Sequence, residues 1–266
     1  MNDYEGLSLH APEAGILVAT LDRPDKYNAL TLTSFPAMSA FFRDVSADRS
    51  VRAVILTGAG KGFCSGLDLE DAVTLSRYSA NEYVSLQQVL GAVASDMRRC
   101  TTPIIAAVNG AAAGAGFSLA LAADIRIAST AAKFNAAFIR IGLTGGDVGS
   151  SYLLPRIVGL GVATEILMTG RFVLPDEALR IGLVSSVVAP SDLMETAVAT
   201  ARSIAANTPL GVRLTKQVIQ TNVDAPSIET ALELESRNQT LAVGNADMKE
   251  ALAAFLEKRA PRFTDR

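Results

Sequence analysis

The chain is poor in the side chains on which several kinds of active site depend. Its 266 residues include one histidine, His10, two cysteines, Cys64 and Cys100, and no tryptophan. This scarcity argues against a disulfide framework and against a His/Cys metal cluster, so we expect no metal site. A serine-histidine triad is also disfavoured, because His10 lies in a polar N-terminal stretch and is expected on the surface. Acid-base chemistry therefore falls to a carboxylate, a tyrosine or a lysine.

The sequence also lacks an excess of positive charge and any long apolar run. Lys and Arg number 24 against 27 Asp and Glu, which gives a net charge of -3 and a pI near 5.3. A phosphate-backbone binder needs the opposite balance, so nucleic acid is not expected as a partner. The first twenty residues show no secretory pattern, and no apolar stretch is long enough to span a bilayer. We expect a soluble, cytoplasmic protein without a membrane partner.

What the chain does have is a large apolar fraction arranged in alternating patterns. Residues are 49% apolar and only 19% charged, which suits one large domain with a big core. Short β-rich runs at 15–22, 51–58, 102–110 and 124–129 alternate with helical stretches near 31–47, at 80–99 and after 113. This alternation predicts an α/β fold with a largely parallel sheet and a ligand site at the strand ends. We predict an α/β core over residues 1–190 and a helical region over 191–266, which covers the core or makes subunit contacts.

Two glycine-rich loops follow strands. GAGKG at 58–62 is no P-loop, because Lys61 is followed by Gly62 instead of Ser or Thr. The stretch from Asn109 to Ser129 has the outline of a dinucleotide turn, but its acid, Asp124, stands at the start of the second strand instead of its end, which disfavours NAD(H). Small residues in both loops allow backbone N–H groups to point into one crevice as an oxyanion hole. The alternative, that these glycines only permit tight turns, stays open from spacing alone.

Seven segments, in order, carry a resemblance to a known family: LDRPDKYNALT, AVILTGAGKGFCSGLDL, PIIAAVNGAAAGAGFSLALAADIRIAS, LPRIVG, MTGR, DEALRIGLVSSVV and FLEKR. Over essentially the whole chain the sequence resembles the enoyl-CoA hydratase/isomerase (crotonase) superfamily. The resemblance implies a spiral of strand-strand-helix (ββα) repeats, with a C-terminal helical region that forms a homotrimer or a dimer of trimers. It implies an acyl-CoA thioester as substrate, so coenzyme A arrives as part of the substrate and no cofactor is permanently bound. The implied oxyanion-hole donors are the backbone N–H groups of Leu67 and Ala115.

The same resemblance implies a path for the coenzyme A and acyl parts of the substrate. It is expected to involve Lys26, Tyr27, Ser65, Gly66, Leu67, Asp68, Gly114, Ser118 and Phe138, with Phe255 and Lys258 reaching it from the tail. Lys26, Lys61 and Lys258 could supply the local positive charge that the coenzyme A phosphates need. Taken without the resemblance, each of these lysines would be read as a solvated surface residue.

The chain departs from the family at the two positions where its hydratases have glutamates. Ser118 and Phe138 occupy them, and neither side chain suits water activation and proton delivery. One carboxylate remains, Asp147, at a position that resembles an aspartate of the dienoyl-CoA isomerases and the nucleophile of 4-chlorobenzoyl-CoA dehalogenase. The dehalogenase histidine is also missing, because Gly91 occupies its place. Isomerase-type or other enolate chemistry with Asp147 as acid and base is therefore favoured over plain hydration.

Several alternatives stay open at this point. Asp147 could cap the helix that follows it, a role compatible with catalysis. The protein could also be a non-catalytic acyl-CoA binder that kept the fold and lost the glutamates. Cys64, next to the first glycine-rich loop, is expected to serve packing, since nothing near it in the sequence would lower its pKa. Asp68 is expected to tie its own loop or cap a short helix.

Overall fold

One large sheet organises the computed structural model of the protein, which describes residues 3–75 and 77–265. Its six strands run in the order β1-β2-β3-β5-β7-β9. They are β1 (Leu7–Glu13), β2 (Ile16–Leu21), β3 (Ala53–Gly58), β5 (Ile104–Val108), β7 (Ile125–Ser129) and β9 (Ser186–Val188). Only β1 and β2 are antiparallel, and every later pair of neighbours is parallel. The prediction of a largely parallel sheet is confirmed.

A smaller parallel sheet contains β4 (Gly62–Cys64), β6 (Ala111–Ala113) and β8 (Lys133–Asn135). Each of its strands follows a strand of the large sheet after a short turn, so that β3 leads to β4, β5 to β6 and β7 to β8. After β4 and after β6 the chain continues into a helix, Leu69–Leu75 and Ala115–Ala122 respectively. The implied spiral of strand-strand-helix repeats is therefore present, and the glycine-rich segment GAGKG at 58–62 connects β3 to β4.

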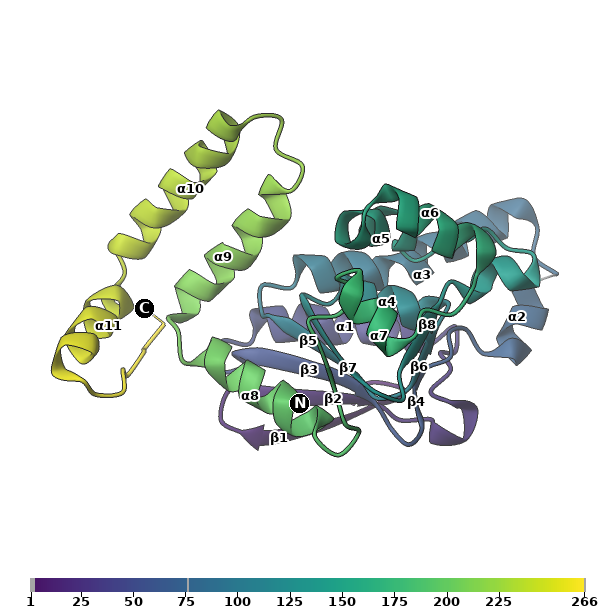
Figure 1. Ribbon diagram of the computed structural model, residues 1–266, viewed down its shortest axis with the longest axis horizontal. Coiled ribbons are helices and arrows are strands. Elements are labelled where there is room, and N and C mark those ends of the chain that lie inside the picture. The colour runs from purple at the N-terminus through teal and green to yellow at the C-terminus, as the bar shows by residue number, and fades with distance from the viewer. Residues whose placement is uncertain (1–2, 76, 266) are drawn as a thin grey trace.

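Helices cover both faces of the large sheet, as the alternation along β3 requires. Val54 and Leu56 pack into a core shared with Phe41 of α1, whereas Ile55 packs on the other face with Ala197 of α8. The first face also carries α3, α4 and α5 (Figure 1). The helices of this core region are α1 (Ser34–Ala47), α2 (Leu69–Leu75), α3 (Ala80–Arg99), α4 (Ala115–Ala122), α5 (Ser150–Val158), α6 (Leu160–Thr169), α7 (Pro175–Arg180) and α8 (Leu193–Ala205), with 3-10 turns η1 (Pro24–Lys26) and η2 (Ala137–Ile141).

The last three helices, α9 (Pro209–Asn222), α10 (Ile228–Val243) and α11 (Ala246–Glu257), form an arm that extends away from the sheets (Figure 1). The root of the arm is held by Lys216, whose Nζ lies 2.7 Å from Asp124 Oδ2 and donates to the Thr102 carbonyl at 3.0 Å. Because α8 packs on the sheet and the arm does not, the helical region over 191–266 contains a covering part and a projecting part. The division at residue 190 itself stays a prediction.

Most predicted elements are present in the structure, but one helix begins later than expected, and β1 and the short strands β4, β6, β8 and β9 were not predicted. The helix at 80–99 has the expected bounds, but the helix expected near 31 begins at Ser34, and the threonine hydroxyls before it bond to Ser34 and Glu5. Strand β1 was not predicted, although its first five residues, LSLHA, alternate apolar and polar side chains; His10 within it is exposed as expected. In the described part of the chain, every helix is too short or too polar to cross a membrane.

Candidate functional site

The loop after β4 and the start of α4 lie against each other. A Cβ placed on Gly66 would lie only 3.3 Å from the Ala115 nitrogen and 2.9 Å from the Ala113 carbonyl oxygen. Gly66 also has a φ of +97°, a conformation open to glycine. Neither Leu67 N–H nor Ala115 N–H has a hydrogen-bond acceptor within residues 3–75 and 77–265. Two unpaired main-chain donors therefore stand in neighbouring segments, at the two residues that the resemblance implies for an oxyanion hole.

Close packing holds these donors in place. Leu30 bridges the first loop, donating to the Gly66 carbonyl and accepting from Asp68 N–H, both at 2.8 Å. In α4 a Cβ on Gly116 would lie 2.1 Å from the Cys64 carbonyl oxygen, so only glycine lets this helix approach β4. All residues of α4 are buried. The positive end of the α4 dipole faces the Gly66 loop, which favours negative charge developing there.

Phe138 lies beside the turn that begins α4. The backbone of Gly114 has φ +52° and ψ -123°, and a Cβ added there would lie 3.4 Å from the Phe138 ring. Phe138 belongs to η2 and is buried. Its ring therefore forms an apolar wall next to the Ala115 donor and offers no proton.

Asp147 stands between η2 and α5 and is partly buried. Its Oδ1 accepts from the N–H of Val148 at 2.8 Å, and its carboxylate makes no ion pair with any described residue. The hypothesis that Asp147 caps α5 is wrong, because the helix begins at Ser150 and the capping position belongs to Gly149 in a left-handed conformation. The carboxylate is therefore left with one oxygen that accepts from no described residue.

Ser118 connects α4 to Asp147. Its hydroxyl is fully buried and donates to the Asp147 carbonyl at 2.9 Å. This hydroxyl occupies the position of the first hydratase glutamate, but it is engaged with main chain instead of facing an open space. The residue thus lies inside the candidate site without being a free polar group.

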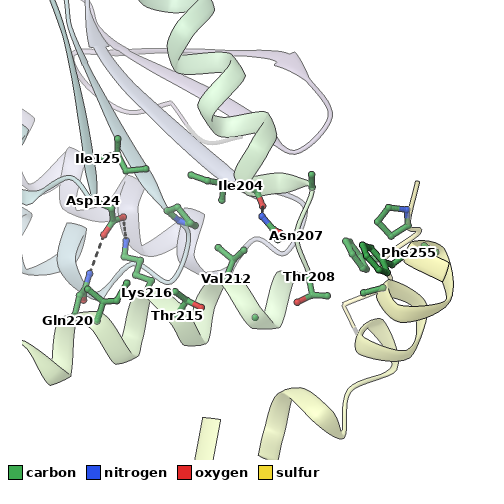
Figure 2. Close-up of a pocket in the computed structure, with 18 of the residues that line it drawn as sticks. Asp124, Ile125, Ile204, Asn207, Thr208, Val212, Thr215, Lys216, Gln220 and Phe255 are labelled. Atoms are coloured by element: carbon green, nitrogen blue, oxygen red, sulfur yellow. Dashed lines mark hydrogen bonds and ion pairs between the residues drawn. The ribbon is translucent and has the colours of Figure 1, made fainter. Parts of the chain in front are cut away.

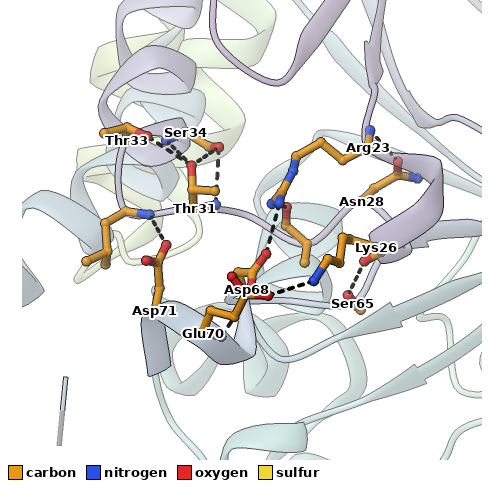
Figure 3. A network of polar contacts seen from close by, with 12 residues as sticks. Arg23, Lys26, Asn28, Thr31, Thr33, Ser34, Ser65, Asp68, Glu70 and Asp71 are labelled. Carbon is orange, nitrogen blue, oxygen red and sulfur yellow. Dashed lines mark hydrogen bonds and ion pairs between the residues drawn. The ribbon is translucent and has the colours of Figure 1, made fainter. Parts of the chain in front are cut away.

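The loop with Lys26 and Tyr27 is joined to the loop that carries Ser65 (Figure 3). Ser65 N–H donates to the Tyr27 carbonyl at 3.0 Å, and its hydroxyl donates to the Lys26 carbonyl at 3.2 Å. Lys26 forms an exposed ion pair with Glu70 at 2.9 Å, and Tyr27 is 57% exposed. Four of the residues expected along the coenzyme A path therefore share one rim, since Gly66 follows Ser65 directly.

Asp68 has a structural role, as the sequence predicted. Its carboxylate is buried, accepts from Glu70 N–H at 3.0 Å and pairs with Arg23 at 2.9 Å (Figure 3). The Glu70 N–H and then the Arg23 guanidinium hold the pKa of Asp68 below its usual value. An ionised, fully occupied carboxylate is a poor general base, so Asp68 anchors the oxyanion loop. Sequence reasoning missed Arg23, although it stands next to Pro24 in a quoted motif.

The cysteine beside the loop is inert. Cys64 is buried, and burial raises the pKa of its thiol to about 12, so it remains protonated at neutral pH. No group of three His, Cys, Asp or Glu residues in the described ranges is arranged to hold a metal ion. Asp147 remains the acid candidate, because its backbone is bonded to Ser118 of the helix that begins with the Ala115 donor.

Phe255 and Lys258 lie elsewhere. Both belong to the end of α11, which Figure 1 places far from α2 and α4. A cavity of about 860 Å³ separates the arm from the sheet, with Phe255 at one end and Asp124 and Lys216 at the other (Figure 2). Within a single chain, the two tail residues are therefore not brought to the oxyanion donors.

Known proteins match this chain over nearly its full length. The sequence profile of the enoyl-CoA hydratase/isomerase family matches residues 11–266. The Mycobacterium tuberculosis protein named "Probable enoyl-CoA hydratase EchA12" is 41% identical over 263 residues, which cover 96% of this chain and 91% of that protein. The 1,2-epoxyphenylacetyl-CoA isomerase of Escherichia coli is 36% identical over 253 residues, or 95% and 96% of the two chains. A solved enoyl-CoA hydratase from Bacillus anthracis has a TM-score of 0.93 at 30% identity and covers 98% of this chain and 100% of its own.

Proposed function

Because this chain belongs to the enoyl-CoA hydratase/isomerase family, it is an enzyme of acyl-CoA thioesters, and we propose that it transfers a proton through an enolate intermediate. The observation that carries the proposal is that two unpartnered N–H groups, at Leu67 and Ala115, lie in neighbouring segments, while Ser118 of the same helix as Ala115 bonds to the backbone of Asp147, whose carboxylate makes no ion pair with a described residue. The favoured reaction is a shift of a carbon-carbon double bond. One similar solved structure, at 40% identity and a TM-score of 0.73, is named a monofunctional enoyl CoA isomerase, which supports this class.

The thioester carbonyl oxygen would accept from Leu67 N–H and Ala115 N–H. Negative charge grows on that oxygen when the adjacent carbon loses a proton, and fixed donors stabilise it without reorganisation. Loss of one such donor typically costs on the order of 3 kcal/mol of barrier. The positive end of α4 acts in the same direction.

Asp147 would move the proton. Its carboxylate takes a proton from C2 of a 3-enoyl thioester, which leaves the enolate, and the resulting carboxylic acid returns the proton to C4. The double bond then lies between C2 and C3, and no water is consumed. One group acting first as base and then as acid is enough for this reaction.

Hydration is less well supported by the side chains present. Adding water requires one group to activate the water and a way to deliver a proton to C2. At the two positions in question Ser118 already donates to a carbonyl, and Phe138 has no proton to give. A non-catalytic acyl-CoA binder is the second candidate, because the same donors would hold a thioester without turnover.

We place the coenzyme A moiety along the rim formed by Lys26, Tyr27 and Ser65, with Phe255 and Lys258 supplied by the arm of a second copy. The chain would then be a homotrimer or a dimer of trimers. Support comes from the arm, which stands away from its own core and exposes large apolar side chains, including Phe255 at 80%. Sedimentation velocity of the full chain tests this part of the proposal.

The deciding experiment follows thioesters by mass spectrometry in deuterated water. A 3-enoyl-CoA, crotonyl-CoA and a dienoyl-CoA are incubated with wild type, Asp147→Asn and Asp176→Asn, the last changing an exposed carboxylate on α7. We expect wild type and Asp176→Asn to shift the double bond or exchange deuterium, and Asp147→Asn to be slower by about 10³-fold. Full activity of Asp147→Asn would contradict the assignment. Binding without change by wild type would favour the binder.

A further inference from the structure

The backbone of Asp147 is held by two buried serines. Ser118 Oγ donates to the Asp147 carbonyl at 2.9 Å, and Asp147 N–H donates to Ser150 Oγ at 3.0 Å. Ser150 N–H also donates to the same carbonyl at 3.0 Å. Both hydroxyls are fully buried. The two peptide units that flank Asp147, in the otherwise glycine-rich segment GGDVG, are thereby both fixed.

The residue after Asp147 has an unfavourable backbone conformation. Val148 has a φ of +47° and is buried, and a β-branched residue rarely adopts this region. Such a conformation costs on the order of 1–3 kcal/mol and persists only where the surroundings enforce it. The 147–148 peptide, whose carbonyl Ser118 holds, also carries the Val148 N–H that donates to Asp147 Oδ1 at 2.8 Å. The carboxylate direction is therefore coupled to the way in which the turn is anchored.

The anchor on one side belongs to α4. Ser118 stands three residues after Ala115, so the two residues lie on successive turns of one short, buried helix. The hydrogen bond from Ser118 thus fixes the position of Asp147 relative to α4, the same rigid helix that carries an oxyanion donor. Ser150, by contrast, belongs to α5 and follows Asp147 closely in the chain.

We propose that Ser118 is a positioning residue for Asp147, setting the distance of the carboxylate from a thioester held at the Ala115 N–H. The inference rests on the proposed function, since it needs Asp147 to transfer the proton. Its physical basis is that misplacement of a reacting group by about 1 Å can cost on the order of 10²-fold in rate. Ser118, which stands where the family's hydratases have a glutamate, thus supports Asp147, the carboxylate that remains.

The test compares Ser118→Ala with Ser129→Ala. Ser129 is an equally buried serine whose hydroxyl donates to the Asn109 carbonyl at 2.9 Å, away from Asp147. Ser118→Ala should lower kcat for deuterium exchange by about 10- to 100-fold with KM changed less than twofold. The fold should persist, because the Asp147 carbonyl keeps the Ser150 N–H. Ser118→Thr, which retains a hydroxyl, should recover part of the rate, and Ser129→Ala should keep the wild-type kcat.

A double substitution separates positioning from general damage. If Ser118 acts only through Asp147, then Ser118→Ala should have no further effect on kcat in an Asp147→Asn background. Equal kcat losses in both backgrounds, or a wild-type kcat for Ser118→Ala, would overturn the positioning role while leaving Asp147 in place. Wild-type exchange by Asp147→Asn alone would overturn the proposed function, and the positioning role with it.

Discussion

The region around α4 and the arm formed by α9, α10 and α11 differ in how far their side chains are buried and bonded within the chain. Around α4, buried polar groups such as Ser118 and Asp68 have partners within the chain, and the apolar residues are packed. On the arm, large apolar side chains such as Leu232 and Leu241 are half exposed or more. The segments around α4 are therefore packed and hydrogen-bonded within one chain, whereas the arm has the surface of an element that lacks a partner.

The largest effect is expected at the close contact between α4 and β4. Gly116→Ala would place a Cβ 2.1 Å from the Cys64 carbonyl, which a buried helix can avoid only by moving. We expect a loss of about 3 kcal/mol in the free energy of unfolding and a large loss of activity, because Ala115 N–H moves with the helix. Urea denaturation and thioester turnover measure the two effects.

Gly91→Ala is the matched control. Gly91 lies within α3, and an added Cβ there meets nothing within 4 Å. Alanine in a helix interior should stabilise the protein by about 0.5–1 kcal/mol and leave turnover unchanged. If both variants behaved alike, the account of α4 as a tightly seated helix would be wrong.

The sequence was sufficient for the elements that depend on local pattern. The buried strand before Gly58 and the helix from Ala80 to Arg99 carry strong apolar and capping signals, and both were predicted. The two small-residue loops also allowed an oxyanion hole, and the resemblance to the family implied Leu67 and Ala115 as its main-chain donors. These features lie in short stretches of sequence, so no distant partner is needed to recognise them.

Contacts between residues that are far apart in the chain could not be predicted from the sequence. Ser118 and Asp147 are 29 positions apart, and Arg23 and Asp68 are 45 apart, so nothing local announces either hydrogen bond. The N-cap hypothesis for Asp147 was reasonable by residue type, but α5 begins at Ser150, so the N-cap position falls on Gly149, two residues after Asp147. The positive φ of Val148 could not be predicted either, because nothing about a valine in the sequence indicates this conformation.

A smaller effect of known sign is expected at the rim of the oxyanion loop. Because Glu70 N–H and Arg23 lower the pKa of Asp68, ionised Asp68 stabilises the folded state at neutral pH. This contribution is complete above the unfolded pKa of about 4 and disappears as the pH falls through the lower folded value. Asp68→Asn should therefore cost about 1–2 kcal/mol at pH 7, and the difference from wild type should shrink below about pH 4. Urea midpoints from pH 7 to pH 2 measure it, and a constant difference would refute this electrostatic role.

The smallest effect on the fold is expected on the arm. Leu232 is 50% exposed on α10, so Leu232→Glu should change the stability of the single chain by less than about 0.5 kcal/mol. If the arm contacts a second copy, the same change places a charge in that interface and should weaken association strongly. Leu160→Glu makes the same change at a 73% exposed leucine of α6, outside the arm, and should leave association unchanged. Sedimentation velocity measures the association of wild type and both variants. A monomeric wild type, or equal effects of the two variants, would contradict the idea that the arm, unlike the core, contacts a second copy.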